Sequence, residues 1–186
     1  MPVVDQDRPL TPAAKRVLEV ASALFYERGI GAVGMELIAG EAGVTKKTVY
    51  DRFGSKEALV LAYLRARDVR WRTFLLDRVE KAGSPRDRVL ATFDALGEWL
   101  REESARGCAM VNALAELPDP EHPGHRVAAG QKAWLRKLYA DLAGDEALAD
   151  KLLILHEGAV VTFSVAGLRD ATKIAREAAA VLLPEA

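Results

Sequence analysis

The residues best suited to chemistry are cations and hydroxyls gathered between positions 45 and 56. This stretch carries a net charge of +3, from Lys46, Lys47, Arg52 and Lys56 against Asp51. Its first residue, Thr45, is typical of a helix cap. Cations in the first turn oppose the helix dipole, so a helix selected only for stability would favour Asp or Glu there. A phosphate would relieve this conflict, since the dipole and the lysines both attract it. A merely solvated surface is the alternative interpretation of the lysines alone.

Histidine and cysteine give little support for catalysis or metal binding. The chain has three histidines and one cysteine, and it lacks the G-x-S-x-G, H-E-x-x-H and phosphate-loop patterns. Glu121, His122 and His125 are close in sequence, but flanking prolines break the spacing that would bring them onto a metal. Cys108 is more typical of a small buried residue than of a redox sensor. We expect no enzymatic activity, metal or cofactor, with an α-helical enzyme as a remote alternative.

Nine helices are expected to position these residues, because no segment alternates apolar and polar residues as a strand would. Their ranges are about 12–28, 35–42, 45–53, 56–82, 85–103, 108–117, 123–143, 146–167 and 171–183. The helices at 35–42 and 45–53 meet at Gly43, and with the helix before them they form a helix-turn-helix unit. The last helix of such a unit enters the major groove of DNA. The lysines would thereby meet phosphates and bases.

The stretch IAGEAGVTKKTVYDRFGSKEALVLAYL, residues 38–64, resembles the DNA-binding helices of TetR-type transcriptional repressors. Many members of that family have Gly or Pro where this chain has Lys47, and Thr often caps their second helix, where this chain has Gly34. Twelve positions meet the family pattern at fixed spacing: Ile38, Ala39, Ala42, Gly43, Val44, Thr45, Thr48, Tyr50, Phe53, Ser55, Lys56 and Leu59.

The resemblance implies a role for each polar residue of this region. Lys46 and Lys47 would reach bases, with guanine O6/N7 as candidate acceptors, from the helix that Thr45 caps. The residues that would contact the DNA backbone are Thr48, Tyr50 and Lys56, with Lys15 and Arg16 from the first helix. Arg52 is a further candidate DNA-binding residue. Arg8 could enter a minor groove, although a disordered tail would explain it equally well. The partner would be a pseudo-palindromic double-stranded operator, read by a homodimer.

The last two helices look suited to pairing with a second copy. Candidate interface residues are Leu152, Leu155, Ala159, Ala166, Ile174, Ala178, Val181 and Leu182. Completion of the monomer core is the alternative. The middle helices hold all three tryptophans, and ligand pockets are mostly apolar with a few polar groups. Candidate residues for a small apolar or amphipathic ligand are Trp71, Phe74, Trp99, Asn112, Glu116, Trp134, His156 and Phe163. Control by a partner protein, without a ligand, stays open.

The composition is that of a globular protein without a membrane span. The 186 residues are 50% hydrophobic, and the longest apolar stretch has about ten residues where a membrane span needs roughly 20. We expect no secretory signal and a cytoplasmic location. The net charge of −1 is the sum of +2 over residues 1–70 and −3 over residues 71–186. We expect an all-α protein with a flexible arm at 1–10, a three-helix DNA-binding domain at 11–55 and a six-helix ligand-binding and dimerisation domain at 56–186.

Overall fold

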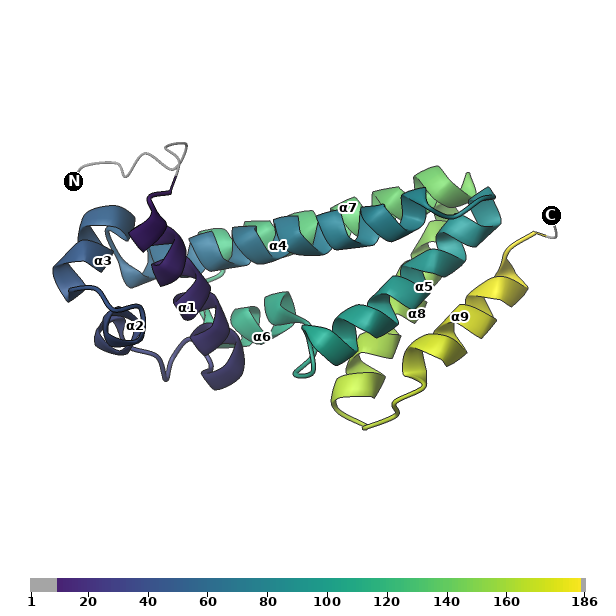
Figure 1. The fold of residues 1–186 in the computed structure, drawn as a ribbon. Coiled ribbons are helices and arrows are strands. Elements are labelled where there is room, and N and C mark those ends of the chain that lie inside the picture. The colour runs from purple at the N-terminus through teal and green to yellow at the C-terminus, as the bar shows by residue number, and fades with distance from the viewer. Residues whose placement is uncertain (1–9, 185–186) are drawn as a thin grey trace. The chain divides into compact units, whose positions relative to one another are not determined.

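The computed structural model describes residues 10–184, and every regular element among them is an α-helix (Figure 1). The absence of strands from this range confirms the predicted all-α class. Most of the predicted N-terminal arm, Arg8 included, lies outside the described residues. The helices are α1 (Pro12–Arg28), α2 (Met35–Glu41), α3 (Lys46–Phe53), α4 (Lys56–Glu80), α5 (Pro85–Glu102), α6 (Ala109–Glu116), α7 (Pro123–Ala143), α8 (Glu146–Ser164) and α9 (Ala171–Leu182).

Helix starts follow the capping residues that are visible in the sequence. Thr11 Oγ1 accepts a hydrogen bond from the Ala14 N–H at 3.2 Å at the start of α1. Ser84 and Asp87 form a reciprocal capping box at the start of α5. Gly34 precedes α2 and supplies no side-chain cap. Caps of this kind satisfy N–H groups that the first helical turn leaves without an intrahelical partner.

The end of α8 falls three residues before the predicted end at Gly167. This glycine has a φ of +71°, a left-handed conformation that side-chain-bearing residues rarely adopt. The turn lets the Leu168 N–H bond to the Thr162 carbonyl at 3.2 Å, six residues back. A left-handed glycine shortly after a helix is a common helix end, and here it closes α8 before the chain continues to α9.

The described residues form two compact units. The first contains the chain up to Arg67 together with Met110–Val127, and the second contains Asp68–Ala109 and the chain from Ala128 onward. In the first unit, α1, α2 and α3 pack on one another around the buried side chains of Val17, Ile38 and Val49. This packing holds the three N-terminal helices as one body.

In the second unit, α5, α8 and α9 pack side by side (Figure 1). Their core contains buried apolar side chains such as Leu152 of α8 and Ala175 of α9. Arg86, at the start of α5, donates hydrogen bonds to the carbonyls of Ala180 and Leu183 at 2.8 and 2.9 Å. These bonds satisfy carbonyls that the end of α9 leaves without intrahelical partners.

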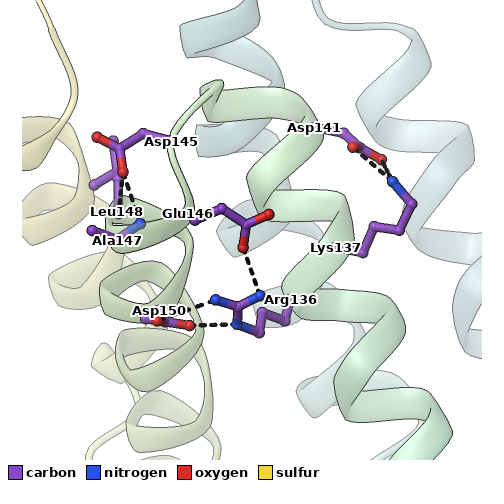
Figure 2. Close-up of polar contacts among 8 residues, drawn as sticks. All are labelled: Arg136, Lys137, Asp141, Asp145, Glu146, Ala147, Leu148 and Asp150. Atoms are coloured by element: carbon purple, nitrogen blue, oxygen red, sulfur yellow. Dashed lines mark hydrogen bonds and ion pairs between the residues drawn. The ribbon is translucent and has the colours of Figure 1, made fainter.

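A charged group at one end of the second unit joins α7 to α8 (Figure 2). Arg136 donates to the carboxylates of both Asp150 and Glu146. Asp145 caps α8 by accepting the N–H groups of Ala147 and Leu148. The bonds to Asp150 from two guanidinium nitrogens have the bidentate geometry that gives arginine–carboxylate pairs their directionality.

Candidate functional site

Helix α3 begins with a cap that leaves its lysines outside. Thr45 Oγ1 accepts a hydrogen bond from the Thr48 N–H at 3.1 Å, as the sequence predicted for a capping threonine. Lys46 and Lys47 follow in the first turn, and both are exposed. The N-terminal turn of α3 therefore presents two ammonium groups beside backbone N–H groups, an arrangement that attracts phosphate.

The opposite face of α3 holds the helix in place. Val49 and Phe53 are buried, and α3 packs on α1 and α2. Tyr50 lies between them in sequence and is exposed. Burial of apolar side chains four residues apart turns the rest of the helix outward. The predicted DNA-facing side of α3 is thus directed to solvent by packing on its inner side.

Both lysines of the first turn pair with carboxylates, which the sequence analysis did not foresee. Lys47 Nζ lies 2.6 Å from Asp51 Oδ2, and Lys46 Nζ lies 4.0 Å from Glu36 Oε2. All four side chains are more than half exposed. Exposed pairs of this kind contribute about 0–1 kcal/mol, so a phosphate can replace the carboxylate at little cost. The spacing of four between Lys47 and Asp51 was the signal for one of these pairs.

The other predicted DNA contacts lie in the same unit. Ser55 Oγ accepts a hydrogen bond from the Ala58 N–H at 3.1 Å. This bond caps the start of α4, whose first residue is Lys56. Lys56 and Arg52 are half-buried, and Lys15 and Arg16 on α1 are exposed. All nine predicted DNA-contact residues belong to the first unit: Lys15, Arg16, Thr45, Lys46, Lys47, Thr48, Tyr50, Arg52 and Lys56.

Aromatic rings gather in the second unit. Trp71 and Trp99 have ring centroids 5.3 Å apart, and Phe74 lies 5.1 Å from Trp99. His156 meets the Trp71 ring at 5.9 Å, edge to face. Phe163 is buried in the same core, and Trp134 packs against this core. The guanidinium of Arg72 lies over the Trp134 ring. The remaining two predicted ligand residues, Asn112 and Glu116, belong to the first unit.

A chain of side-chain hydrogen bonds runs through this aromatic core, and it was not predicted. Tyr139 OH lies 2.9 Å from Thr92 Oγ1 and 2.9 Å from His156 Nδ1. All three side chains are buried. Burial lowers the pKa of His156 to about 3 and raises the pKa of the Tyr139 hydroxyl well above its ordinary value. Both groups are therefore neutral at physiological pH.

A second polar group surrounds the single cysteine. Lys132 Nζ donates to both carboxylate oxygens of Glu157, at 2.7 and 2.8 Å, and lies 3.5 Å from Cys108 Sγ. Cys108 is half-buried. These residues come from three separate segments, so the sequence offered no spacing signal for the group.

The side chains of His122 and His125, at the start of α7, each bond to a backbone group. His122 Nδ1 accepts the Gly124 N–H at 3.0 Å, and His125 Nε2 lies 2.9 Å from the Leu117 carbonyl. Across the described part of the chain, no three His, Cys, Asp or Glu residues come together as a metal site would require. Within residues 10–184, no helix is both long and apolar enough to cross a bilayer.

The predicted dimer residues divide between core and surface. Leu152 and Ala159 are buried inside their own unit, and Leu155 and Ala178 are half-buried. The exposed residues of the predicted set are Ala166, Ile174, Val181 and Leu182. Three exposed apolar residues in and directly after α8 were missed: Ile154, Val161 and Val165, with exposed fractions of 71%, 56% and 81%. Their spacing of seven and four is the helical signal that could have revealed them.

Comparisons with known proteins find similarity to transcriptional regulators. The model of a family described as bacterial regulatory proteins, tetR family, matches residues 17–63. An HTH-type transcriptional regulator of Mycobacterium tuberculosis is 31% identical over 93 residues, which cover 50% of this chain and 46% of that protein. The chain thus matches less than half the length of this relative.

Two further relatives cover more of the chain. The HTH-type transcriptional repressor KstR2 of Mycolicibacterium smegmatis is 27% identical over 146 residues, 74% of this chain and 69% of that protein. The crystal structure of a TetR-family transcriptional regulator from Streptomyces coelicolor superposes with a TM-score of 0.85 at 29% identity, covering 94% of this chain and 91% of that one. The likeness therefore extends beyond the N-terminal helices.

Proposed function

Because the chain belongs to the TetR family of bacterial regulatory proteins, we propose that it is a sequence-specific DNA-binding transcriptional regulator. It acts as a homodimeric repressor that a small-molecule ligand releases from its operator. The observation that carries the proposal is the N-terminal turn of α3, where exposed Lys46 and Lys47 stand over a buried face of Val49 and Phe53. Its partner is the bacterial chromosome, so it works in the cytoplasm.

The first unit supplies the DNA contacts. Lys46 and Lys47 exchange their carboxylate partners for base edges in the major groove. Thr48, Tyr50 and Lys56 hold phosphates on either side and set the register of α3 on the duplex. Residues 11–55 then form the reading domain, and residues 56–186 form the ligand-binding and dimerisation domain.

The second unit supplies the dimer contact. Ile154 and Val161 on α8 and Val165 directly after it are exposed at a spacing typical of one helix face, and Ile174 and Val181 on α9 are also exposed. Large contiguous apolar surfaces are rare on monomeric soluble proteins, so exposed apolar side chains on these two helices favour a covering partner. A second copy covers it by two-fold pairing, which places two α3 helices for two half-sites about one helical turn apart or a multiple of it.

The aromatic core of the second unit supplies the ligand site. Ligand binding changes operator affinity only if the ligand binds the two states of the protein differently. Similarity to the repressor KstR2 supports repression as the direction of control.

The test begins with selection of bound sequences from a random double-stranded library. We expect a pseudo-palindrome, to which the K46A/K47A variant binds more than tenfold more weakly. K137A is the matched control, since Lys137 also forms an exposed pair with an aspartate four residues later, on α7 (Figure 2). Failure to select any preferred sequence, or equal losses in K46A/K47A and K137A, would overturn the proposal.

Phosphate and base contacts separate in a second measurement. K56A and Y50F should weaken binding to all sequences alike, because phosphates carry no base information. K56A should also reduce the slope of log affinity against log salt by about one unit. A loss confined to the selected operator would contradict the phosphate role of Lys56. Fluorescence anisotropy at several salt concentrations provides both readings.

A further inference from the structure

The buried polar chain of the second unit has one consistent arrangement of protons. Thr92 Oγ1 donates its hydrogen to the Val89 carbonyl at 2.7 Å, since a carbonyl can only accept. A hydroxyl has one hydrogen, so Thr92 can only accept at its 2.9 Å contact with Tyr139. Tyr139 therefore donates to Thr92, and its single hydrogen is used.

The same count fixes the tautomer of His156. Tyr139 has no hydrogen left, so its oxygen accepts at the 2.9 Å contact with His156 Nδ1. The imidazole is neutral, because burial lowers the pKa of His156 to about 3. A neutral imidazole has one N–H, here on Nδ1, and Nε2 is left as a lone-pair acceptor.

The acceptor at Nε2 is available. Within residues 10–184 it accepts no hydrogen bond, although the His156 residue is only 3% exposed. Trp71 and Phe93 lie around the same ring, with centroid distances of 5.9 and 6.1 Å. After burial, the positive charge of Lys132 is the second cause that lowers the pKa of His156. Both carboxylate oxygens of Glu157 accept hydrogen bonds from Lys132 and compensate its charge. Two aromatic rings thus lie next to the imidazole that carries this unused acceptor.

We infer that the ligand is a neutral aromatic compound with a hydroxyl or N–H group, which donates a hydrogen bond to His156 Nε2 while its ring packs against Trp71. This inference rests on the proposed ligand site and names the chemistry of its occupant. A carboxylate or phosphate is rejected, since it would bring a second acceptor to a lone pair and would lose its hydration on burial. An apolar compound without a donor leaves the acceptor without a hydrogen bond.

The first experiment reads the tautomer directly. The H122Q/H125Q variant keeps His156 as its only histidine, and ¹⁵N NMR of the imidazole identifies the protonated nitrogen. We expect a neutral ring with the hydrogen on Nδ1 in the ligand-free protein at pH 7. Protonation at Nε2, or a charged ring, overturns the inference. The wild-type spectrum provides the same reading should the double variant fold poorly.

The second experiment compares three probes of one shape. We expect 2-naphthol to bind the wild-type protein at least tenfold more tightly than 2-methoxynaphthalene, which lacks the donor, and 2-naphthoate to bind weakest. Isothermal titration calorimetry in the absence of DNA measures each affinity. Failure of 2-naphthol to bind, or equal or tighter binding of either other probe, overturns the inference.

A variant connects the preference to the proton arrangement. Y139F removes the oxygen that holds the Nδ1 hydrogen, so the tautomer is released and the preference for naphthol over its ether should fall to less than threefold. Y63F, at a buried tyrosine of the first unit, is the control and should keep the full preference. An unchanged preference in folded Y139F overturns the arrangement. Because the titrations contain no DNA, a failed operator selection would refute the proposed function without affecting them.

Discussion

At the scale of single residues, His156 ties stability to pH. Its pKa of about 3 in the folded protein is depressed from an ordinary value near 6.5. The unfolded chain therefore takes up a proton in a range where the folded protein does not. The stability contribution of this histidine is complete above pH 6.5 and is lost progressively as the pH falls toward 3. The slope between these limits is about 1.4 kcal/mol per pH unit at most.

This dependence can be isolated with H156N, whose amide can still donate to Tyr139 but does not titrate. We expect the free energy of unfolding, measured in urea between pH 7.5 and 4.5, to fall more steeply in the wild type than in H156N. H125Q, at a half-buried histidine, is the control for removal of a histidine elsewhere in the chain. Parallel curves for the wild type and H156N would show that His156 is not neutral in the folded protein.

The residues that could be predicted from sequence are those whose signal is local. Thr45 was identified as a cap from its own position, and the Thr48 N–H bond bears this out. The hydrogen-bonded chain in the aromatic core was missed, because Tyr139 is 47 residues from Thr92 and 17 from His156. No spacing rule relates residues this far apart, since only tertiary packing brings them together.

At the scale of elements, the last residue of α6 holds the turn between α1 and α2 within the first unit. Glu116 Oε2 accepts the Gly31 N–H at 2.7 Å. Gly29, with a φ of +88°, ends α1 directly against the same carboxylate, whose Oε1 would lie 3.0 Å from an added Cβ. Glycine thus permits both the turn and the close approach. The bond joins α6 to the helices that carry the proposed DNA contacts.

We expect E116A to release this turn. The Gly31 amide should exchange with solvent about tenfold faster, since a hydrogen bond to a charged group contributes about 1.5–3 kcal/mol. Operator affinity should fall with it, because the turn sets the position of α2 beneath α3. E121A, an exposed glutamate of the same unit, is the control. Wild-type exchange of Gly31 in E116A would show that the carboxylate does not hold the turn.

Helix starts could be predicted more closely than helix faces. The cap at Thr45 marked the start of α3, because capping depends on neighbouring residues alone. The stripe containing Leu152 and Ala159 shares one face of α8, yet this face packs into the core of its own unit. Periodicity shows which residues share a face and leaves open which partner covers it.

At the scale of the whole molecule, charge and apolar surface occupy different parts of the chain. The net charge of −1 gave no sign of a nucleic-acid partner, since residues 1–70 carry +2 and residues 71–186 carry −3. The lysines of α3 lie in the first unit, and the exposed apolar residues of α8 and α9 lie in the second. Loss of the proposed dimer should therefore leave α3 folded while removing the second proposed DNA-reading helix.

Val161 of α8 is the position at which to test this separation. It is 56% exposed, so V161D should leave the thermal unfolding midpoint of the isolated chain nearly unchanged. In a dimer the aspartate would be buried without a partner, so we expect a monomer by light scattering after size exclusion. V69D is the matched control, because Val69 of α4 is 63% exposed outside α8 and α9. The V161D monomer should lose binding to the full palindrome far more than to a single half-site; a dimeric V161D would place the interface elsewhere.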